Sequence, residues 1–165
     1  LEKGEFRFPM DGRRAPCRSM HCKIIAIGKP ALDWARAGIA DYLQRLTRYG
    51  KTAIEYLKEG TAAQNSERLL KASEGSRRIV MDERGRLQGT AAVRGAVDRW
   101  EMDSGIKRVS FLIGGADGHT EALRKEADEV WALSPLTLQH ELALVVLLEQ
   151  LYRVHTIKKG EPYHR

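Results

Sequence analysis

The chain of 165 residues is long enough for one domain with a buried core, since 42% of its residues are hydrophobic. Its formal net charge of +6 and pI near 9.5 favour an acidic partner such as nucleic acid, although many basic proteins merely carry solvated lysines. Its two cysteines, Cys17 and Cys22, exclude a disulfide scaffold, and no apolar stretch reaches the roughly 18 residues of a membrane span. We therefore expect a soluble, reduced, cytoplasmic protein.

The first 19 residues show no periodic hydrophobic pattern. Glycine, proline and scattered charges are mixed here, and Met20 stands directly before the first orderly apolar run. We expect Met20 to be the natural start. Residues 1–19 would then be a flexible extension or an expression remnant, and residues 20–165 a single domain.

In chain order, apolar runs typical of strands alternate with patterns typical of amphipathic helices. The strands are expected at 23–28, 52–57, 78–81, 109–113 and 130–133. The helices are expected over 30–49, 66–75, 90–103, 121–128 and 137–155. Ser66 and Thr137 are the expected N-caps of the second and last helices, and residues 82–85 are expected to form a charged turn. This alternation predicts a three-layer α/β fold with a mainly parallel sheet.

The last predicted helix is apolar over more than one narrow stripe. Leu142, Val145, Leu148 and Leu151 cover much of its circumference, so it needs burial on more than one side. This surplus of apolar surface favours a dimer, although a single domain can also bury it.

The fourth predicted strand ends in residues 114–118, Gly-Gly-Ala-Asp-Gly, which we call the glycine loop. Glycine lets the backbone approach a ligand closely, and ligands of open α/β sheets bind beyond the carboxyl ends of the strands. An ordinary strand-to-helix turn explains the spacing equally well. The loop is neither G-x-G-x-x-G nor a Walker loop, so dinucleotide binding is not expected, and the scattered histidines predict no metal site.

Four segments, in order, resemble the signatures of one family. They are FLIGGADG at 111–118, WALSPLTLQH at 131–140, LEQLYR at 148–153 and GEPYHR at 160–165. Over residues 20–165 the chain resembles the ribosomal large subunit methyltransferase H family of the SPOUT class. This resemblance implies an S-adenosylmethionine-dependent enzyme that methylates N3 of a pseudouridine in 23S rRNA, within the ribosome. It also implies a homodimer. It further implies a carboxyl-terminal trefoil knot, and no periodicity in the sequence indicates that knot.

The resemblance places the methyl donor in the loops of the knot. Adenine is a flat, mostly apolar ring whose edge can hydrogen bond to main-chain groups, so leucines with exposed backbone would suit it. By composition alone, these leucines are more readily explained as core residues. The implied donor-binding residues are Met81, Gly114, Gly115, Ala132, Leu133, Ser134, Pro135, Leu136, Thr137 and Leu138.

The resemblance also brings the last three residues, Tyr163, His164 and Arg165, beside the target base, supplied across the dimer. Composition alone indicates a disordered terminus. Uracil N3 carries a weakly acidic proton, so a proton acceptor and a cation near it would promote methylation. We hypothesise that His164 takes the proton and that Arg165 or Arg153 holds a carbonyl oxygen or a phosphate. Simple positioning of donor and acceptor is the alternative source of acceleration.

Candidate substrate contacts are His140, Arg86 and Arg153. A wider basic set would supply salt-dependent affinity for the rRNA backbone near the site. That set is Arg86, Lys107, Arg108, Arg153, Lys158 and Lys159.

Two positions depart from the family pattern. Gln139 stands where the family usually has Pro before the histidine, and Leu144 where it has Arg four residues after it. The second removes a charge that would contact donor or RNA, which puts full activity in question. The alternative function is therefore a non-catalytic RNA- or ribosome-binding protein with the same fold. Binding of S-adenosylmethionine separates the two hypotheses.

Overall fold

The computed structural model describes residues 21–164, except for the side chain of His164. Several predictions fall outside the described residues. They concern the start at Met20, the extension over residues 1–19, Cys17, Arg165 and the imidazole of His164. No helix among residues 21–164 is long and apolar enough to cross a membrane.

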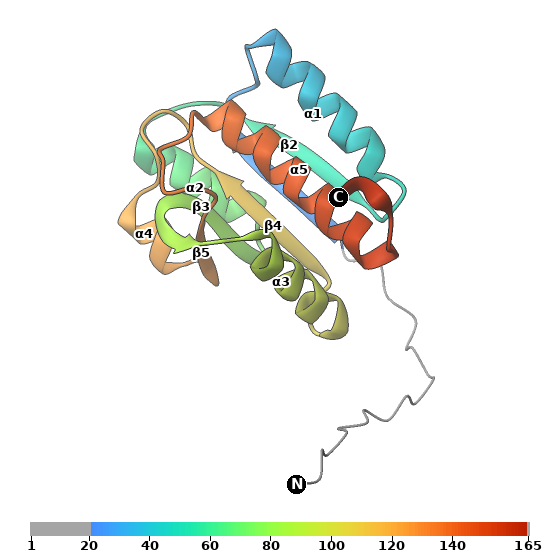
Figure 1. Ribbon diagram of the computed structural model, residues 1–165. Helices are drawn as coiled ribbons and strands as arrows, with labels where there is room; N and C mark the ends of the chain where they lie inside the picture. The colour runs from blue at the N-terminus through green and yellow to red at the C-terminus, as the bar shows by residue number, and fades with distance from the viewer. Residues whose placement is uncertain (1–20, 165) are drawn as a thin grey trace, which may run out of the picture.

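Five strands of the described chain form one sheet (Figure 1). They are β1 (His21–Ile27), β2 (Thr52–Leu57), β3 (Arg77–Leu87), β4 (Arg108–Ile113) and β5 (Glu129–Ala132). Their order is β2-β1-β4-β3-β5, and every neighbouring pair is parallel. The five predicted strands and the parallel sheet are thus confirmed. Threading of the chain through a knot remains a prediction.

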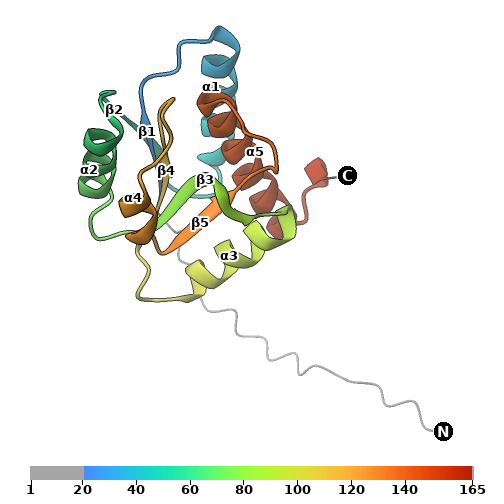
Figure 2. The ribbon, with the colours of Figure 1, turned by 90° about the vertical axis from the view of Figure 1, so that its left-hand side faces the viewer.

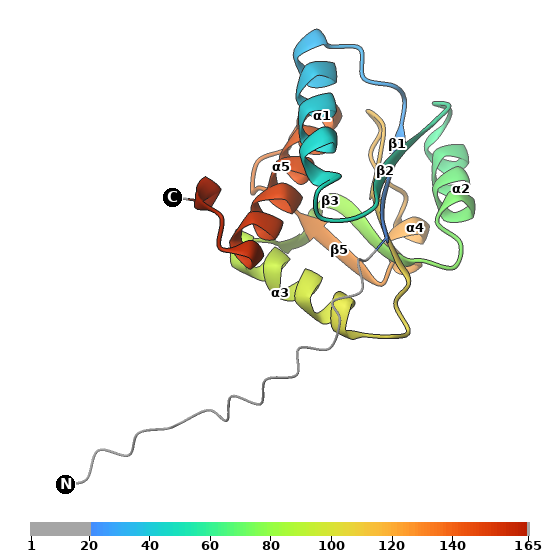
Figure 3. The same ribbon diagram turned by 90° about the vertical axis from the view of Figure 1, so that its right-hand side faces the viewer.

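Helices cover both faces of this sheet. Figures 2 and 3 show α2 and α4 on one side of the sheet and α1, α3 and α5 on the other. Side chains alternate between the faces, so Ile24 packs toward α1 and α5 while Ile25 packs toward α2. The three-layer α/β fold is confirmed. The helices are α1 (Asp33–Leu46), α2 (Ala62–Ala72), α3 (Thr90–Met102), α4 (Glu121–Lys125) and α5 (His140–Lys159), followed by the 3-10 turn η1 (Pro162–His164).

Helix α5 lies against both α1 and α3 and covers the sheet between them (Figure 1). Leu144, Leu147, Leu148 and Leu151 are buried in this position. Leu142, at 37% exposed, and the half-buried Val145 and Val146 are left accessible, so one chain buries only part of the apolar surface of α5 and both explanations of the surplus stay open.

Three expected helix ends were wrong, two because another nearby polar residue provides the cap and one because of a contact distant in sequence. Thr61, not Ser66, caps α2, where it forms a reciprocal capping box with Gln64, while Ser66 bonds Thr120 at 2.8 Å. Gln139, not Thr137, caps α5 by accepting a hydrogen bond from Leu142 N at 2.9 Å. The helix expected over 121–128 ends at Lys125, because Asp128 turns back to pair with the backbone of Arg78.

The charged turn expected at residues 82–85 is instead part of β3. The strand shifts register between Met81 and Arg86 and pairs with β5 again at Trp131 and Ala132. Gly85 lies at this irregularity, where a Cβ atom would lie 2.6 Å from the backbone carbonyl of Val130. The extension of β3 therefore depends on a residue without a side chain.

We expect Gly85→Ala to lower the free energy of unfolding by about 3 kcal/mol, because the new methyl group overlaps backbone that cannot rotate away. Urea unfolding followed by circular dichroism measures this loss. Gly95→Ala in α3 is the matched control, since its Cβ would make only an ordinary contact with Arg99. Equal unfolding midpoints for the two variants would contradict the close packing of β3 on β5.

Candidate active site

A cavity of about 480 Å³ opens at the carboxyl ends of β3 and β4. Its floor includes Met81, Ile113 and Trp131, which are register partners on three adjacent strands. The glycine loop follows β4 directly, and the loop between β5 and α5 closes the opposite side. The cavity thus lies where open parallel sheets bind ligands, and the glycine loop borders it.

Most of the predicted donor-binding residues meet in this cavity. Leu136 is 71% exposed and Leu133 and Leu138 are half-buried, so these leucines are not plain core residues. Ala132, buried at the end of β5, and Pro135, exposed, do not line the cavity. The predicted residues that line it are Met81, Gly114, Gly115, Leu133, Ser134, Leu136, Thr137, Leu138 and His140.

The cavity also contains charged residues that the sequence reasoning missed. Asp82, Glu83 and Arg84 belong to the β3 extension, which the sequence presented as a turn. Their position directly after a buried strand end was the available signal. His119 and Arg124 carried no such signal, because neither is part of a recognisable motif.

The glycine loop is tightly packed. Gly118 has φ +68° and donates its N–H to the Gly115 carbonyl at 3.1 Å, so the loop is a narrow turn. A Cβ on Gly114 would lie 3.1 Å from Cε1 of His119 and 3.2 Å from the backbone of Gly118. A Cβ on Gly115 would lie 3.1 Å from a carboxylate oxygen of Glu59. Close packing against the Gly118 backbone therefore favours glycine at position 114 independently of any ligand, whereas at position 115 the contacts are with side chains.

Two polar contacts hold the cavity wall to β3. Arg124 pairs with Asp82 at 2.9 Å and donates to the His119 carbonyl at 2.7 Å. On the other side of the cavity, the Thr137 hydroxyl donates to the carboxylate of Glu83. The β3 extension thus connects the glycine loop to the loop that precedes α5.

The first turn of α5 is fixed by a buried carboxylate next to His140. Glu141 accepts hydrogen bonds from the backbone N–H groups of Ala31 and Leu32, at 3.1 Å and 3.0 Å. Burial alone would raise the pKa of Glu141, but these two donors and the neighbouring His140 together hold it below its usual value. Glu141 therefore stays ionised and anchors the start of α1 to the helix that carries His140.

The tail, Tyr163–Arg165, begins far from this cavity within one chain. Tyr163 packs edge-on against Tyr152 with ring centroids 4.7 Å apart, at the end of α5 opposite to His140. The rise of an α-helix puts Arg153 about 20 Å from His140 along the axis. Of the predicted catalytic residues, the structure therefore places Tyr163 outside the cavity of its own chain, while the His164 side chain and Arg165 lie outside the described residues.

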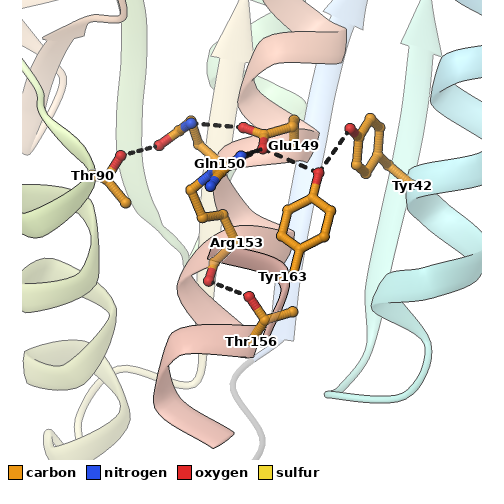
Figure 4. A network of polar contacts seen from close by, with 7 residues as sticks. All are labelled: Tyr42, Thr90, Glu149, Gln150, Arg153, Thr156 and Tyr163. Carbon is orange, nitrogen blue, oxygen red and sulfur yellow. Dashed lines mark hydrogen bonds and ion pairs between the residues drawn. The ribbon is translucent and has the colours of Figure 1, made fainter. Parts of the chain in front are cut away.

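Figure 4 shows the polar network that holds Tyr163 and Arg153. The Tyr163 hydroxyl donates to Glu149 Oε1 at 3.2 Å, so the Tyr42 hydroxyl, 3.1 Å away, donates to Tyr163. Arg153 donates to the same carboxylate oxygen through Nε at 2.9 Å and Nη2 at 2.6 Å, and its guanidinium lies 4.9 Å from the Tyr163 ring centroid. Burial, the Tyr42 hydroxyl and the Glu149 charge raise the pKa of Tyr163, so it is a hydrogen-bond donor at neutral pH.

The basic residues do not form one patch beside the cavity. Lys107 and Arg108 precede or begin β4, at the end of the sheet opposite to the glycine loop, and Arg108 donates to the Glu74 carbonyl at 2.6 Å. Lys158 forms ion pairs with Asp98 and Glu101. The expectation that the whole set lies near the site was wrong for Lys107 and Arg108. These two residues lie at the start of β4 and the glycine loop follows its end, so the length of the strand separates them from the cavity. Arg86, beside Glu129 at 3.6 Å, is 69% exposed in its side chain.

Two other kinds of reactive centre are metal sites and cysteine thiols. Among residues 21–164, no group of three or more His, Cys, Asp or Glu residues is placed to hold a metal ion. Burial in β1 raises the pKa of the Cys22 thiol to about 12, so this cysteine is not a nucleophile at neutral pH.

A protein family described as "Predicted SPOUT methyltransferase" matches residues 20–164. The chain belongs to this family. The chain is similar to proteins named ribosomal RNA large subunit methyltransferase H. The Thermus thermophilus protein is 48% identical over 88% of this chain and 99% of that protein. The Deinococcus radiodurans protein is 42% identical, also over 88% of this chain and 99% of that protein. The Geobacter metallireducens protein of that name is 41% identical, again over 88% and 99%.

Solved structures agree with the SPOUT assignment at the level of the fold. A probable methylase family protein from Haemophilus influenzae superposes with a TM-score of 0.56 at 10% identity, covering 88% of this chain and 71% of that one. The tRNA (m1G37) methyltransferase from Aquifex aeolicus gives 0.51 at 10% identity, covering 81% and 70%. The α/β SPOUT fold is therefore confirmed.

The two departures have structural explanations in this SPOUT methyltransferase. Gln139 serves as the N-cap of α5, a place where Pro has no side-chain oxygen to offer. Leu144 is 2% exposed and packs in the core beneath α5. Leucine at this position is therefore a core residue in this chain.

Proposed function

We propose that this chain is an S-adenosylmethionine-dependent methyltransferase that acts on N3 of a pseudouridine in 23S rRNA, as a cytoplasmic homodimer with a knotted carboxyl-terminal part. The observation that carries the proposal is the cavity at the ends of β3 and β4, lined by most of the residues that the resemblance implies for donor binding. The relatives named ribosomal RNA large subunit methyltransferase H support the substrate, because the chain covers 99% of their length. Nothing among the described residues favours a non-catalytic RNA-binding protein.

The cavity suits the donor in size and chemistry. Its volume of about 480 Å³ falls within the roughly 300–1,000 Å³ typical of pockets for small ligands. Leu133, Leu136 and Leu138 would bind the adenine ring, and the backbone of Gly114 and Gly115 would face the methionine part. When bound, S-adenosylmethionine supplies an electrophilic methyl group on a sulfonium centre. Asp117 is a further carboxylate at the rim that favours a positively charged ligand.

The chain's own residues would handle the proton and the base. Methylation at N3 requires loss of the N3 proton, and we assign its acceptance to the imidazole of His164. Tyr163 is not the base, since its raised pKa keeps its hydroxyl protonated. Instead Tyr163, held by Glu149 and Tyr42, would fix the direction of the tail. Arg165 would stabilise the negative charge that develops on the uracil ring.

The position of Tyr163 supports the proposed homodimer. Tyr163 is held by Glu149 and Tyr152 on the middle and carboxyl-terminal part of α5 and does not line the cavity, whereas His140 at the start of α5 does. A second subunit whose tail reaches the cavity of the first completes it. Arg86 and His140 on the cavity side, and Arg153 on the tail side, would then contact the RNA around the target base.

The test is methyl transfer from radiolabelled S-adenosylmethionine to ribosomes and to free 23S rRNA that both lack the modification. We expect one methyl group per 23S rRNA, located at N3 of a pseudouridine by mass spectrometry of nuclease fragments. Donor binding without transfer to either RNA substrate would contradict the proposed reaction. Ribosome binding without donor binding would support the non-catalytic alternative.

A further inference from the structure

His119 occupies a buried position between β3 and the glycine loop. It directly follows Gly118, is 9% exposed, and lines the cavity. Its Nε2 lies 3.1 Å from the Met81 carbonyl oxygen, and since a carbonyl can only accept, Nε2 donates. The ring also lies against Gly114, where an added Cβ would be 3.1 Å from Cε1. One imidazole therefore connects the end of the loop to the strand that forms the cavity floor.

The chain on the far side of His119 is anchored independently. The Thr120 hydroxyl accepts from Leu123 N at 3.2 Å, which caps α4, and bonds Ser66 of α2 at 2.8 Å. Arg124 of α4 holds the His119 carbonyl. With Thr120 fixed in this way, the glycine loop has one rigid end at Ile113 and another at Thr120. The His119 ring is its cross-connection to β3.

We propose that His119 is a positioning residue that holds the glycine loop against β3, so that the affinity for the methyl donor depends on its buried, hydrogen-bonded ring. The inference rests on the proposed function, because it assigns a role within the donor cavity. His119 does not react with the substrate. It acts through the position of Gly114 and Gly115.

The charges around His119 set the direction of the pH dependence. Burial lowers the pKa of His119, and the charge of Arg124 lowers it further. Asp82 and the carbonyls of Met81 and Leu112 raise the pKa, but the net result is a pKa below the ordinary value. Asp82 on β3 and Arg124 on α4 are the charged groups facing the ring, while Asp117 and His140 line the same cavity. The imidazole is therefore neutral in the closed loop at neutral pH.

Opening of the loop would expose the ring and return its pKa toward about 6.5. The open form then binds more protons than the closed form in the interval between the two pKa values. Acid therefore favours the open loop, and the stabilisation by neutral His119 is present above about pH 6.5 and lost as the pH falls through the pKa of the closed form. Donor affinity should fall over the same interval.

Calorimetric titration with S-adenosylmethionine between pH 5.5 and 8.0 tests this dependence. His119→Leu removes the imidazole N–H at similar side-chain volume. We expect S-adenosylmethionine to bind roughly fivefold more weakly at pH 7.5, as for loss of one hydrogen bond, and the affinity to be independent of pH. His119→Gln keeps an uncharged N–H, so it should bind within about twofold of wild type at pH 7.5, and its affinity should also be independent of pH. The wild type should show the acid weakening. Wild-type affinity or a wild-type pH slope in His119→Leu would overturn the proposal.

Hydrogen exchange of the donor-free protein provides a second readout that does not need the donor. At a single pH of 7.5, the amides of residues 115–119 should exchange roughly fivefold faster in His119→Leu than in the wild type, with β1 and β2 unchanged. Equal exchange in that segment would overturn the positioning role. Failure of the wild type to bind S-adenosylmethionine would instead contradict the proposed function, and the exchange data would still decide on His119.

Discussion

Replacing Gly114 by valine should abolish binding of S-adenosylmethionine, with a loss of affinity of roughly 100-fold or more. The glycine is buried between β4 and the loop that it opens. A Cβ there would already lie 3.1 Å from the His119 ring and 3.2 Å from the Gly118 backbone, and valine adds two further methyl groups. The His119 side chain can give way, whereas the Gly118 backbone cannot move without moving the loop. The wall of the donor cavity would therefore be displaced.

Calorimetric titration of the purified protein measures this effect, with circular dichroism to confirm that the variant is folded. Gly89→Val is the matched control. Gly89 has φ −88° and ψ 164°, which valine adopts readily, and no atom lies within 4 Å of an added Cβ. It should bind the donor within about twofold of wild type. Wild-type affinity in a folded Gly114→Val variant would place the donor outside the cavity.

Exchanging both His164 and Arg165 for alanine should reduce methyl transfer by roughly 100-fold or more, with donor affinity unchanged. These substitutions leave Tyr163 in its contacts with Glu149 and Tyr42, so the direction of the tail is preserved. The proposed proton acceptor and the cation beside the base would both be lost. Radiolabel transfer to ribosomes, together with calorimetry, separates the effect on chemistry from the effect on binding. Tyr42→Phe, which removes one hydrogen bond to Tyr163 but no proposed reacting group, should cause a smaller loss of methyl transfer and so separates the direction of the tail from the chemistry.

Mixing two inactive variants tests whether the tail acts across the dimer. A subunit with Gly114→Val retains its tail, and a subunit with the alanine tail retains its donor cavity. After joint unfolding and refolding, about half of the dimers contain one subunit of each variant. Each such dimer has one complete site out of two, so about a quarter of wild-type activity should return. No recovery from a mixture that refolds to dimers would mean that each tail serves its own subunit.

Local sequence determined most of the fold because its signals depend on near neighbours. The apolar runs before Gly28 and Gly114 gave strands of the expected span, and the register that pairs Met81 with Ile113 follows from parallel strands ending together. The capping box of Thr61 and Gln64 is also a local signal, since the two residues are three positions apart, but several polar residues near the start of α2, Ser66 among them, are equally common caps.

The site needed information that no local pattern contains. The hydrogen bond from His119 to Met81 joins residues 38 positions apart, and the pair of Arg124 with Asp82 joins residues 42 apart. Glu141 reaches Leu32 across 109 positions. The charged residues 82–84 resemble a turn in the sequence. In the structure they belong to the irregular part of β3, where the register shifts and the strand is less buried than before it. Such contacts arise only when distant segments compete for buried polar groups.

The sequence by itself determined the alternation of strands and helices, the glycine loop after β4 and the family signatures that point to methyl transfer, because each depends on residues close together in the chain. Only the tertiary structure decided that the β3 extension and His119 form the cavity wall, that the leucines of the loop before α5 are half-exposed, and that the tail begins at the far end of α5. The reason is that burial and hydrogen bonding are set by how the layers pack, which couples residues far apart in sequence.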